Sequence, residues 1–212
     1  MFRRRKDATS DEPVDEPTTG PTTGEPGPRA NGPWDASEAD LEEPDENRVD
    51  LGSLLITARE GVDVQLQVDE ESGEVAAVLL AAEDGAIELR AFAAPRNGDI
   101  WQDVRRDLAG EVTQMGGTAT ETTGPFGPQV SVSMGVQLPD GSRAQQASTV
   151  VGIGGPRWLL RATMFGRPAV AYDEEGALEQ ALRDVVVVRG TGPMPPGDAL
   201  PLTMPPTARR IS

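Results

Sequence analysis

The sequence predicts an α+β fold in which an antiparallel sheet carries two packed helices, with a disordered acidic N-terminal tail before it and a proline-rich tail after it. Several short runs alternate apolar and polar residues between turns rich in Gly, Asp and Pro, as half-buried strands require. Two longer segments, 99–115 and 174–187, instead carry apolar residues at helical spacing. The order of strands, helix, strands, helix favours helices packed on an antiparallel sheet.

Composition divides the chain of 212 residues into three parts. Residues 1–48 contain 13 acidic and 6 basic groups and few large apolar side chains, so they cannot bury enough surface to offset the entropy of ordering. Residues 49–190 hold the predicted strands and helices as a single domain. Residues 191–212 form the proline-rich C-terminal tail.

Trp34 is exceptional within the acidic tail. Asp35 or Ser37 could cap a short helix that extends through Glu43. Together with Leu41, the tryptophan would suit a partner-binding motif, although isolated aromatic residues also occur in tails without any role.

The first half of the domain predicts a meander of strands followed by one helix. The stretch "VDVQLQV" alternates strictly, whereas "VAAVLLAA" is unbroken and is typical of a strand covered on both faces. The helix has Asp99 as its N-cap and Gly116 as its stop. The strands are expected over residues 51–58, 62–68, 75–82 and 86–94.

The second half predicts another set of strands, a helix and the C-terminal tail. The turn "PDG" joins two strands, and "GG" leads into "PRWLLRATMF". Asp173 caps the last helix, and the acidic residues of its first turn match the helix dipole. In the tail, Leu200, Leu202 and Met204 alternate between prolines, so we expect an extended segment tethered to an apolar part of the domain. The strands are expected over residues 129–138, 142–153 and 156–165.

Composition also excludes several classes of chemistry. The chain has no cysteine and no histidine, and its single lysine, Lys6, lies in the acidic tail. Ser-His-Asp and Cys-His catalysis, Schiff-base lysines, phosphate-loop lysines and almost every zinc site are thereby excluded, and we expect neither a metal nor a cofactor. The net charge of −16 repels phosphate backbones, so nucleic acid is not an expected partner.

The N-terminal sequence predicts a cytoplasmic protein. No run of about 18 apolar residues occurs, so no transmembrane segment is expected. "MFRRRKD" is basic, but "ATSDEPVDEP" follows it where a signal peptide requires an apolar segment. Residues 2–6 could make only a weak peripheral contact with anionic lipid.

The strand "PRWLLRATMF" has one apolar face and one mixed face. Trp158 and its alternating neighbours point one way, so arginines project from the other side. These guanidinium groups either pair with nearby acids such as Glu88 or form a strip that binds an acidic peptide or the chain's own segment "DASEADLEEPDE". The candidate binding residues are Arg157, Arg161 and Arg167, with Arg90 from a neighbouring strand.

Three blocks in order, "GGPRWLLRATMFG", "DVVVVRG" and "MPPGDALPLTMP", resemble the actinobacterial family of domains of unknown function numbered 3710. The resemblance covers about residues 48–206 and implies no particular activity. The order of strands and helices is also similar to the PsbP-like α/β sandwich, in which a central sheet carries long helices. This second likeness is an analogy at the level of the fold.

These observations favour a non-catalytic binding or adaptor domain over an enzyme. The domain lacks the usual nucleophiles, bases and metal ligands, and its carboxylates fall in turns and helix caps, where acids are expected anyway. The partner would be another protein or the chain's own acidic tail. Two alternatives stay open: a small-molecule enzyme that relies on carboxylates or arginines, and a peripheral membrane protein that binds through "FRRRK".

Overall fold

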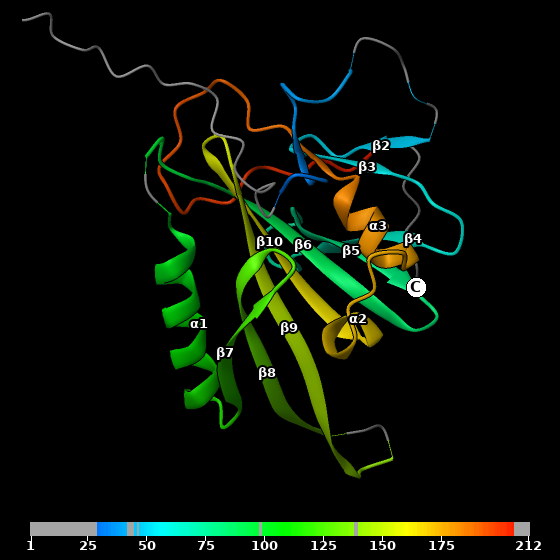
Figure 1. Ribbon diagram of the computed structural model, residues 1–212, viewed down its shortest axis with the longest axis vertical. Helices are drawn as coiled ribbons and strands as arrows, with labels where there is room; N and C mark the ends of the chain where they lie inside the picture. The colour runs from blue at the N-terminus through cyan, green and yellow to red at the C-terminus, as the bar shows by residue number, and fades with distance from the viewer. Residues whose placement is uncertain (1–28, 42–44, 46, 98, 138–139, 206–212) are drawn as a thin grey trace, which may run out of the picture.

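The computed structural model describes residues 29–41, 45, 47–97, 99–137 and 140–205, which form a seven-stranded and a four-stranded sheet (Figure 1). The predicted antiparallel sheet with packed helices is confirmed in the larger of the two. Its strand order is β4-β5-β6-β10-β9-β8-β7, and neighbouring strands all pair antiparallel. The strands span Asp63–Val68 (β4), Val75–Ala82 (β5), Gly85–Ala93 (β6), Thr118–Gly124 (β7), Gly127–Gln137 (β8), Arg143–Gly155 (β9) and Trp158–Gly166 (β10).

The central strands β6 and β10 place the main core on one face of the large sheet. Their apolar residues alternate, and the register sets Leu160 opposite Ala91 and Ala162 opposite Leu89. All four are at most 4% exposed. This face, which includes the fully buried Trp158, packs against the second sheet and the short helices α2 (Arg167–Val170) and α3 (Ala177–Arg183).

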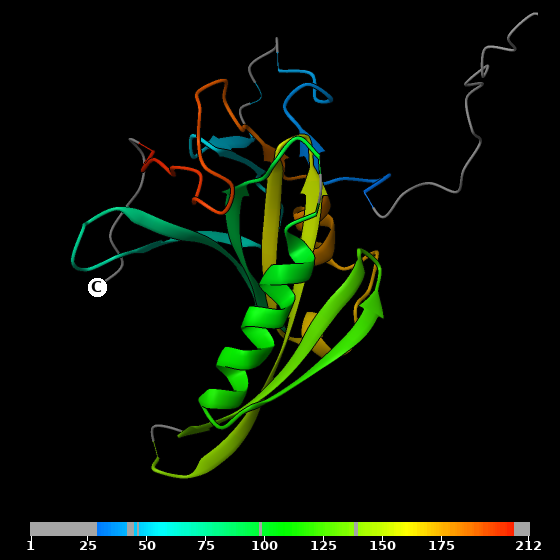
Figure 2. The ribbon, with the colours of Figure 1, turned by 90° about the vertical axis from the view of Figure 1, so that its left-hand side faces the viewer.

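The opposite face of the large sheet carries α1 (Trp101–Gln114), which packs on β7 and β8 (Figure 2). Asp99 Oδ1 accepts a 2.8 Å hydrogen bond from the backbone N–H of Trp101, the first residue of the helix. The N-cap position is Ile100 and not the predicted Asp99, which lies one residue before it. The Trp101 indole covers Gly152, where a Cβ would come within 2.2 Å of the ring. Its Nε1 donates to the carbonyl of Pro128 at 2.7 Å. Neither α1 nor any other helix within the described ranges is long and apolar enough to cross a membrane.

The second sheet contains short strands in the order β1-β11-β3-β2. The apolar run at 51–58 contributes to this sheet and not to the predicted meander, because Leu54 and Leu55 pair with the late valines of β11. The helix predicted over 174–187 ends at Arg183, since the β-branched valines that follow favour a strand. The strands span Trp34–Asp35 (β1), Arg48–Asp50 (β2), Leu54–Thr57 (β3) and Val186–Val187 (β11).

Part of the predicted disordered tail, residues 1–48, instead belongs to this second sheet. β1 pairs in parallel with β11, in a register that sets Trp34 opposite Val186. The helix predicted here is wrong for the described part: Asp35 Oδ1 accepts the backbone N–H of Ser37 at 3.0 Å and closes a turn. The composition of residues 1–48 as a whole does not reveal this strand, because the strand with which it pairs lies near the other end of the chain. Residues 1–28 and Glu43, the expected helix end, lie outside the described residues.

The proline-rich segment after β11 is extended and bridges the two sheets. The backbone N–H of Leu200 donates to the carbonyl of Ala91 in β6 at 2.8 Å, and that of Thr203 donates to Leu51 beside β3 at 2.9 Å. Leu200 is buried in the main core, as the alternation predicts. Met204, predicted as another apolar contact, is 52% exposed.

Candidate functional site

Two of the four predicted binding arginines lie side by side on the large sheet. Arg161 of β10 and Arg90 of β6 are direct cross-strand partners on the face opposite the main core. The Arg161 guanidinium lies 5.3 Å from the centroid of the Phe92 ring, and Arg90 Nε donates a 2.9 Å hydrogen bond to Glu88 Oε1. Arg90 thus lies on a strand next to that of Arg161, as predicted, and the two side chains share a face.

Of the two arginines, Arg161 has fewer polar contacts. Its half-buried guanidinium makes no hydrogen bond or ion pair with any residue that the structure describes. Burial lowers the pKa of Arg161, and the positive charge of Arg90 lowers it further, whereas Glu88 and Glu111 oppose this shift. Like charges directly opposite on neighbouring strands destabilise a sheet. An anionic group between the two arginines would remove this repulsion.

The two arginines lie at the border of the area that α1 covers: Gly152, opposite Arg161 on β9, is under Trp101 of α1, and Glu111 of α1 acts electrostatically on Arg161. Along the β4-β5-β6 side, to the left of α1 in Figure 2, no helix of the described residues packs on this face. Leu79, Glu88 and Thr163 form one row across three strands, and the arginine pair forms the next. We call this half-exposed set the arginine face; it consists of Leu79, Glu88, Arg90, Phe92, Arg161 and Thr163.

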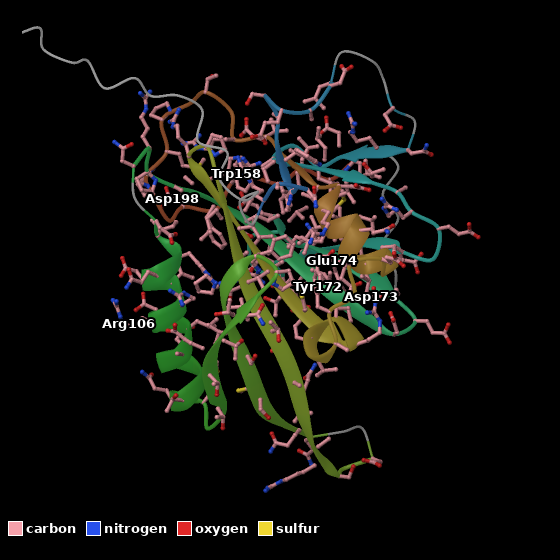
Figure 3. The ribbon with its side chains drawn as sticks, viewed as in Figure 1. Arg106, Trp158, Tyr172, Asp173, Glu174 and Asp198 are labelled. Atoms are coloured by element: carbon pink, nitrogen blue, oxygen red, sulfur yellow. The ribbon has the colours of Figure 1, made fainter. Side chains whose placement is uncertain are left out.

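Arg167 does not lie on the arginine face, and its predicted placement on the strand is wrong. β10 ends at Gly166, and Arg167 begins α2. Its Nη1 and Nη2 donate to the two carboxylate oxygens of Glu179 at 2.9 Å each, and its Nε donates to Asp84. These bonds, foremost those to Glu179, raise the pKa of Arg167. The backbone N–H of Asp173, labelled in Figure 3, donates to the same fully buried Glu179 at 3.1 Å, so this arginine already serves a carboxylate of the core.

Arg157 also lies outside the strand, in the turn between β9 and β10, so its predicted placement on the strand face is wrong too. β9 ends at Gly155 and β10 begins at Trp158, because Pro156 and Arg157 form the turn between them. Arg157 has a φ of 64°, a left-handed conformation that is uncommon for residues other than glycine. Its carbonyl accepts a 2.8 Å hydrogen bond from the N–H of Ala94.

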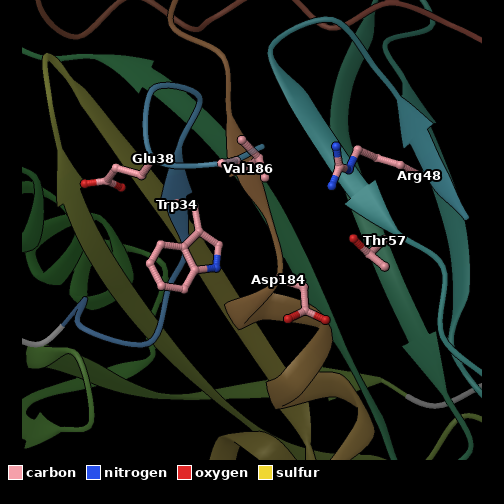
Figure 4. A pocket seen from close by; sticks show the side chains of 7 residues that line it. Trp34, Glu38, Arg48, Thr57, Asp184 and Val186 are labelled. Atoms are coloured by element: carbon pink, nitrogen blue, oxygen red, sulfur yellow. The ribbon is translucent and has the colours of Figure 1, made fainter. Parts of the chain in front are cut away.

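A second candidate site is a hollow of about 340 Å³, lined by the N-terminal segment around Trp34 and by residues of β2, β3 and β11 (Figure 4). The two carboxylates at its edge are each paired with an arginine. Glu38 accepts a 2.5 Å hydrogen bond from Arg29, which lowers the pKa of Glu38 to about 2. Asp184 accepts a 2.8 Å hydrogen bond from Arg59 Nε. The lining includes Trp34, Glu38, Arg48, Thr57, Asp184 and Val186, of which only Trp34 attracts notice in the sequence.

Comparison with known proteins identifies a family but no activity. The family model described as "Protein of unknown function (DUF3710)" matches residues 32–210. No curated protein is significantly similar in sequence. A protein of Bacteroides thetaiotaomicron VPI-5482, with a crystal structure at 1.50 Å, is 12% identical with a TM-score of 0.37; the match covers 64% of this chain but spans only 45% of that protein's chain. The PsbP protein of the cyanobacterium Synechocystis sp. PCC 6803 is 10% identical with a TM-score of 0.38, over 70% of this chain and 99% of that one.

Proposed function

The chain belongs to the DUF3710 family of proteins of unknown function, and we propose that it is a non-catalytic binding domain that holds an acidic segment of a partner protein on its arginine face. The observation that carries this proposal is the pair Arg90 and Arg161. Two guanidinium groups oppose each other across neighbouring strands, and Arg161 has no carboxylate bonded to it within the described residues.

A carboxylate is the ligand that this pair suits best. A guanidinium presents five N–H donors in a planar fork that matches the two oxygens of Asp or Glu. Among the described residues Glu88 bonds only to Arg90, so the donors of Arg161 are available to an incoming side chain. A negative charge there would also relieve the repulsion between the two arginines.

The neighbouring side chains favour a peptide over a free anion. Phe92 stacks with Arg161, and the half-exposed Leu79 lies one row away across β5 and β6. These apolar groups would contact alternate side chains of an extended segment in which acidic and apolar residues follow one another. The expected ligand is therefore an acidic peptide with apolar residues between its carboxylates.

The chain's own segment around residues 30–41 does not provide this ligand. Asp35 accepts a hydrogen bond from Trp158 on the core side of the sheet, and Glu38 is bonded to Arg29. The earlier expectation that this segment docks on the arginines is therefore wrong for its described residues. This placement favours a partner protein as the source of the acidic segment.

An enzyme that relies on carboxylates is the weaker alternative. Such catalysis needs two acids that face a substrate with at least one of them free to exchange protons. In the described hollow beside Trp34, Glu38 and Asp184 are each held by an arginine. Because both acids are paired with arginines, the hollow is better suited to binding a ligand than to acid–base catalysis. Two further expectations stay predictions: a cytoplasmic location, and weak lipid contact through residues 2–6, which lie outside the described residues.

Calorimetric titration tests the proposal with an octapeptide of alternating glutamate and leucine, and with its glutamine–leucine counterpart as the neutral control. The full chain should bind the acidic peptide only, and Arg161→Gln should weaken binding about tenfold, as the loss of charged hydrogen bonds implies. Arg106→Gln is the matched control, because Arg106 is exposed on the outer side of α1 (Figure 3). Equal binding by the parent chain and Arg161→Gln would refute the proposal.

A further inference from the structure

We propose that the hollow beside Trp34 binds a small planar aromatic carboxylate. In Figure 4 the Trp34 indole and the Arg48 guanidinium stand on opposite sides of the hollow, with Val186 between them. The site thus combines an aromatic surface, an apolar side chain and a cation. Its volume of about 340 Å³ is at the lower end of the range for small-ligand pockets, which suits one aromatic ring with an acid group.

Arg48 has donors that the described residues leave unused. Its Nη1 reaches the carbonyl of Asp40 only at 3.4 Å, and its Nη2 lies 3.7 Å from Asp45 Oδ2. Its Nε is shielded from solvent and has no hydrogen-bond partner among the residues that the structure describes. Nη1 and Nη2 therefore keep donors for a ligand, and a carboxylate that accepts charge-assisted hydrogen bonds from them would be favoured.

The acidic side chains of the hollow do not prevent an anion from binding. Glu38 and Asp184 are neutralised by Arg29 and Arg59, which bond to them directly. Arg48 is thus the lining residue whose charge is least compensated. This distribution of charge selects a ligand with one negative group on the Arg48 side and an uncharged ring on the other.

Trp34 suits the ring of such a ligand. The Nε1 groups of Trp101 and Trp158 donate to Pro128 and Asp35, whereas Trp34 Nε1 donates to no group in the described part of the chain. The half-buried Trp34 therefore offers an aromatic face, which favours offset or edge-to-face contact with another ring. The resonance of this indole N–H should also report whether a ligand occupies the hollow.

This site is separate from the arginine face. Trp34 pairs with β11 in the small sheet, on the core side of the large sheet, whereas Arg90 and Arg161 project from the opposite side. Either proposal can therefore fail while the other stands.

Nuclear magnetic resonance of the three indole N–H groups tests the inference, with benzoate as the probe and benzamide as its uncharged counterpart. The Trp34 signal, assigned by its loss in Trp34→Phe, should move with millimolar benzoate and stay in place with benzamide. Arg48→Gln should weaken benzoate binding about tenfold. Arg143→Gln should bind like the parent chain, because Arg143 is exposed at the far end of β9.

The signals of Trp101 and Trp158 report whether each variant keeps its fold. If Arg48→Gln disturbs them, Arg48→Lys is used, which keeps the charge but lacks the planar pair of Nη donors and should still bind benzoate several-fold more weakly than the parent. The inference would be overturned if the Trp34 signal did not shift with benzoate. It would also be overturned if the parent and a folded Arg48 variant bound benzoate equally well.

Discussion

Trp158 Nε1 donates a 2.7 Å hydrogen bond to Asp35 Oδ2, so a fully buried tryptophan of the central strand is held by a residue of the N-terminal segment. The Arg29 guanidinium lies 5.4 Å from the centroid of the Trp158 ring, and Arg29 also bonds to Glu38. These contacts make the segment around Trp34 an integral part of the fold.

Replacement of Asp35 should destabilise the whole domain. Asp35→Ala leaves the Trp158 indole N–H buried without an acceptor, which should cost about 2 kcal/mol of unfolding free energy. Urea unfolding measures the loss, with Asp63→Ala as the control at an exposed position on β4. If Asp35→Ala unfolds at the same urea concentration as the control, the segment is dispensable for stability.

Acid should weaken the contact between Arg29 and Glu38. The hydrogen bond from Arg29 lowers the pKa of Glu38 from its ordinary 4.5 to about 2. The folded state therefore binds this proton less readily than the unfolded chain, so the contribution is present above pH 4.5 and disappears as the pH falls toward 2. The effect should be small because the side chain of Glu38 is 36% exposed. Urea midpoints at about pH 6 and about pH 3 should differ less in Glu38→Gln than in the parent chain; an unchanged difference would refute the role of this pair.

Replacement of Arg167 should lower the free energy of unfolding more than replacement of its partner Glu179. Arg167→Met leaves the fully buried Glu179 without its cation, which should cost about 3 kcal/mol or more. Glu179→Gln keeps a hydrogen-bonding group without the buried charge and should cost less. Thermal unfolding of both variants checks this order. The reverse order would show that the carboxylate does not depend on Arg167.

The C-terminal segment should stabilise the domain through Leu200. Leu200→Ala removes a side chain that is 3% exposed and should cost about 2 to 3 kcal/mol, whereas Met204→Ala, at an exposed position, should be nearly neutral. The amide of Ala93, which donates to Asp198, should exchange its hydrogen faster in Leu200→Ala. Equal stability of the two variants would mean that the contact of Leu200 with the core does not stabilise the domain.

Local alternation predicts the central strands because their apolar faces are buried in a regular way. β4, β5, β6, β8, β9 and β10 all follow runs visible in the sequence. β7 has no such pattern: "TATETTG" is an edge strand whose side chains are mostly exposed. The strands of the small sheet are also difficult to predict, because they are two to four residues long and β11 pairs with β1 and β3, which are distant from it in sequence.

Some residues of the candidate sites can likewise be placed from the sequence, and others cannot. Arg90 and Arg161 can be placed on one face because each lies inside a long strand. Arg157 and Arg167 cannot, because alternation does not reveal where β10 begins and ends. The hollow beside Trp34 joins Arg48 of β2 to Asp184 after α3, and no local spacing connects these residues.

The arginine face is tested most directly by the side-chain Nε–Hε resonances of Arg90 and Arg161 during titration of the full chain with the glutamate–leucine octapeptide. Both signals should shift at low salt, shift less as salt screens the charges, and stay in place with the neutral peptide. The Arg106 signal should not move, because Arg106 projects away from the sheet on the outer side of α1. Binding of the acidic peptide that leaves the Arg90 and Arg161 signals unchanged would place its site elsewhere and contradict the proposed function.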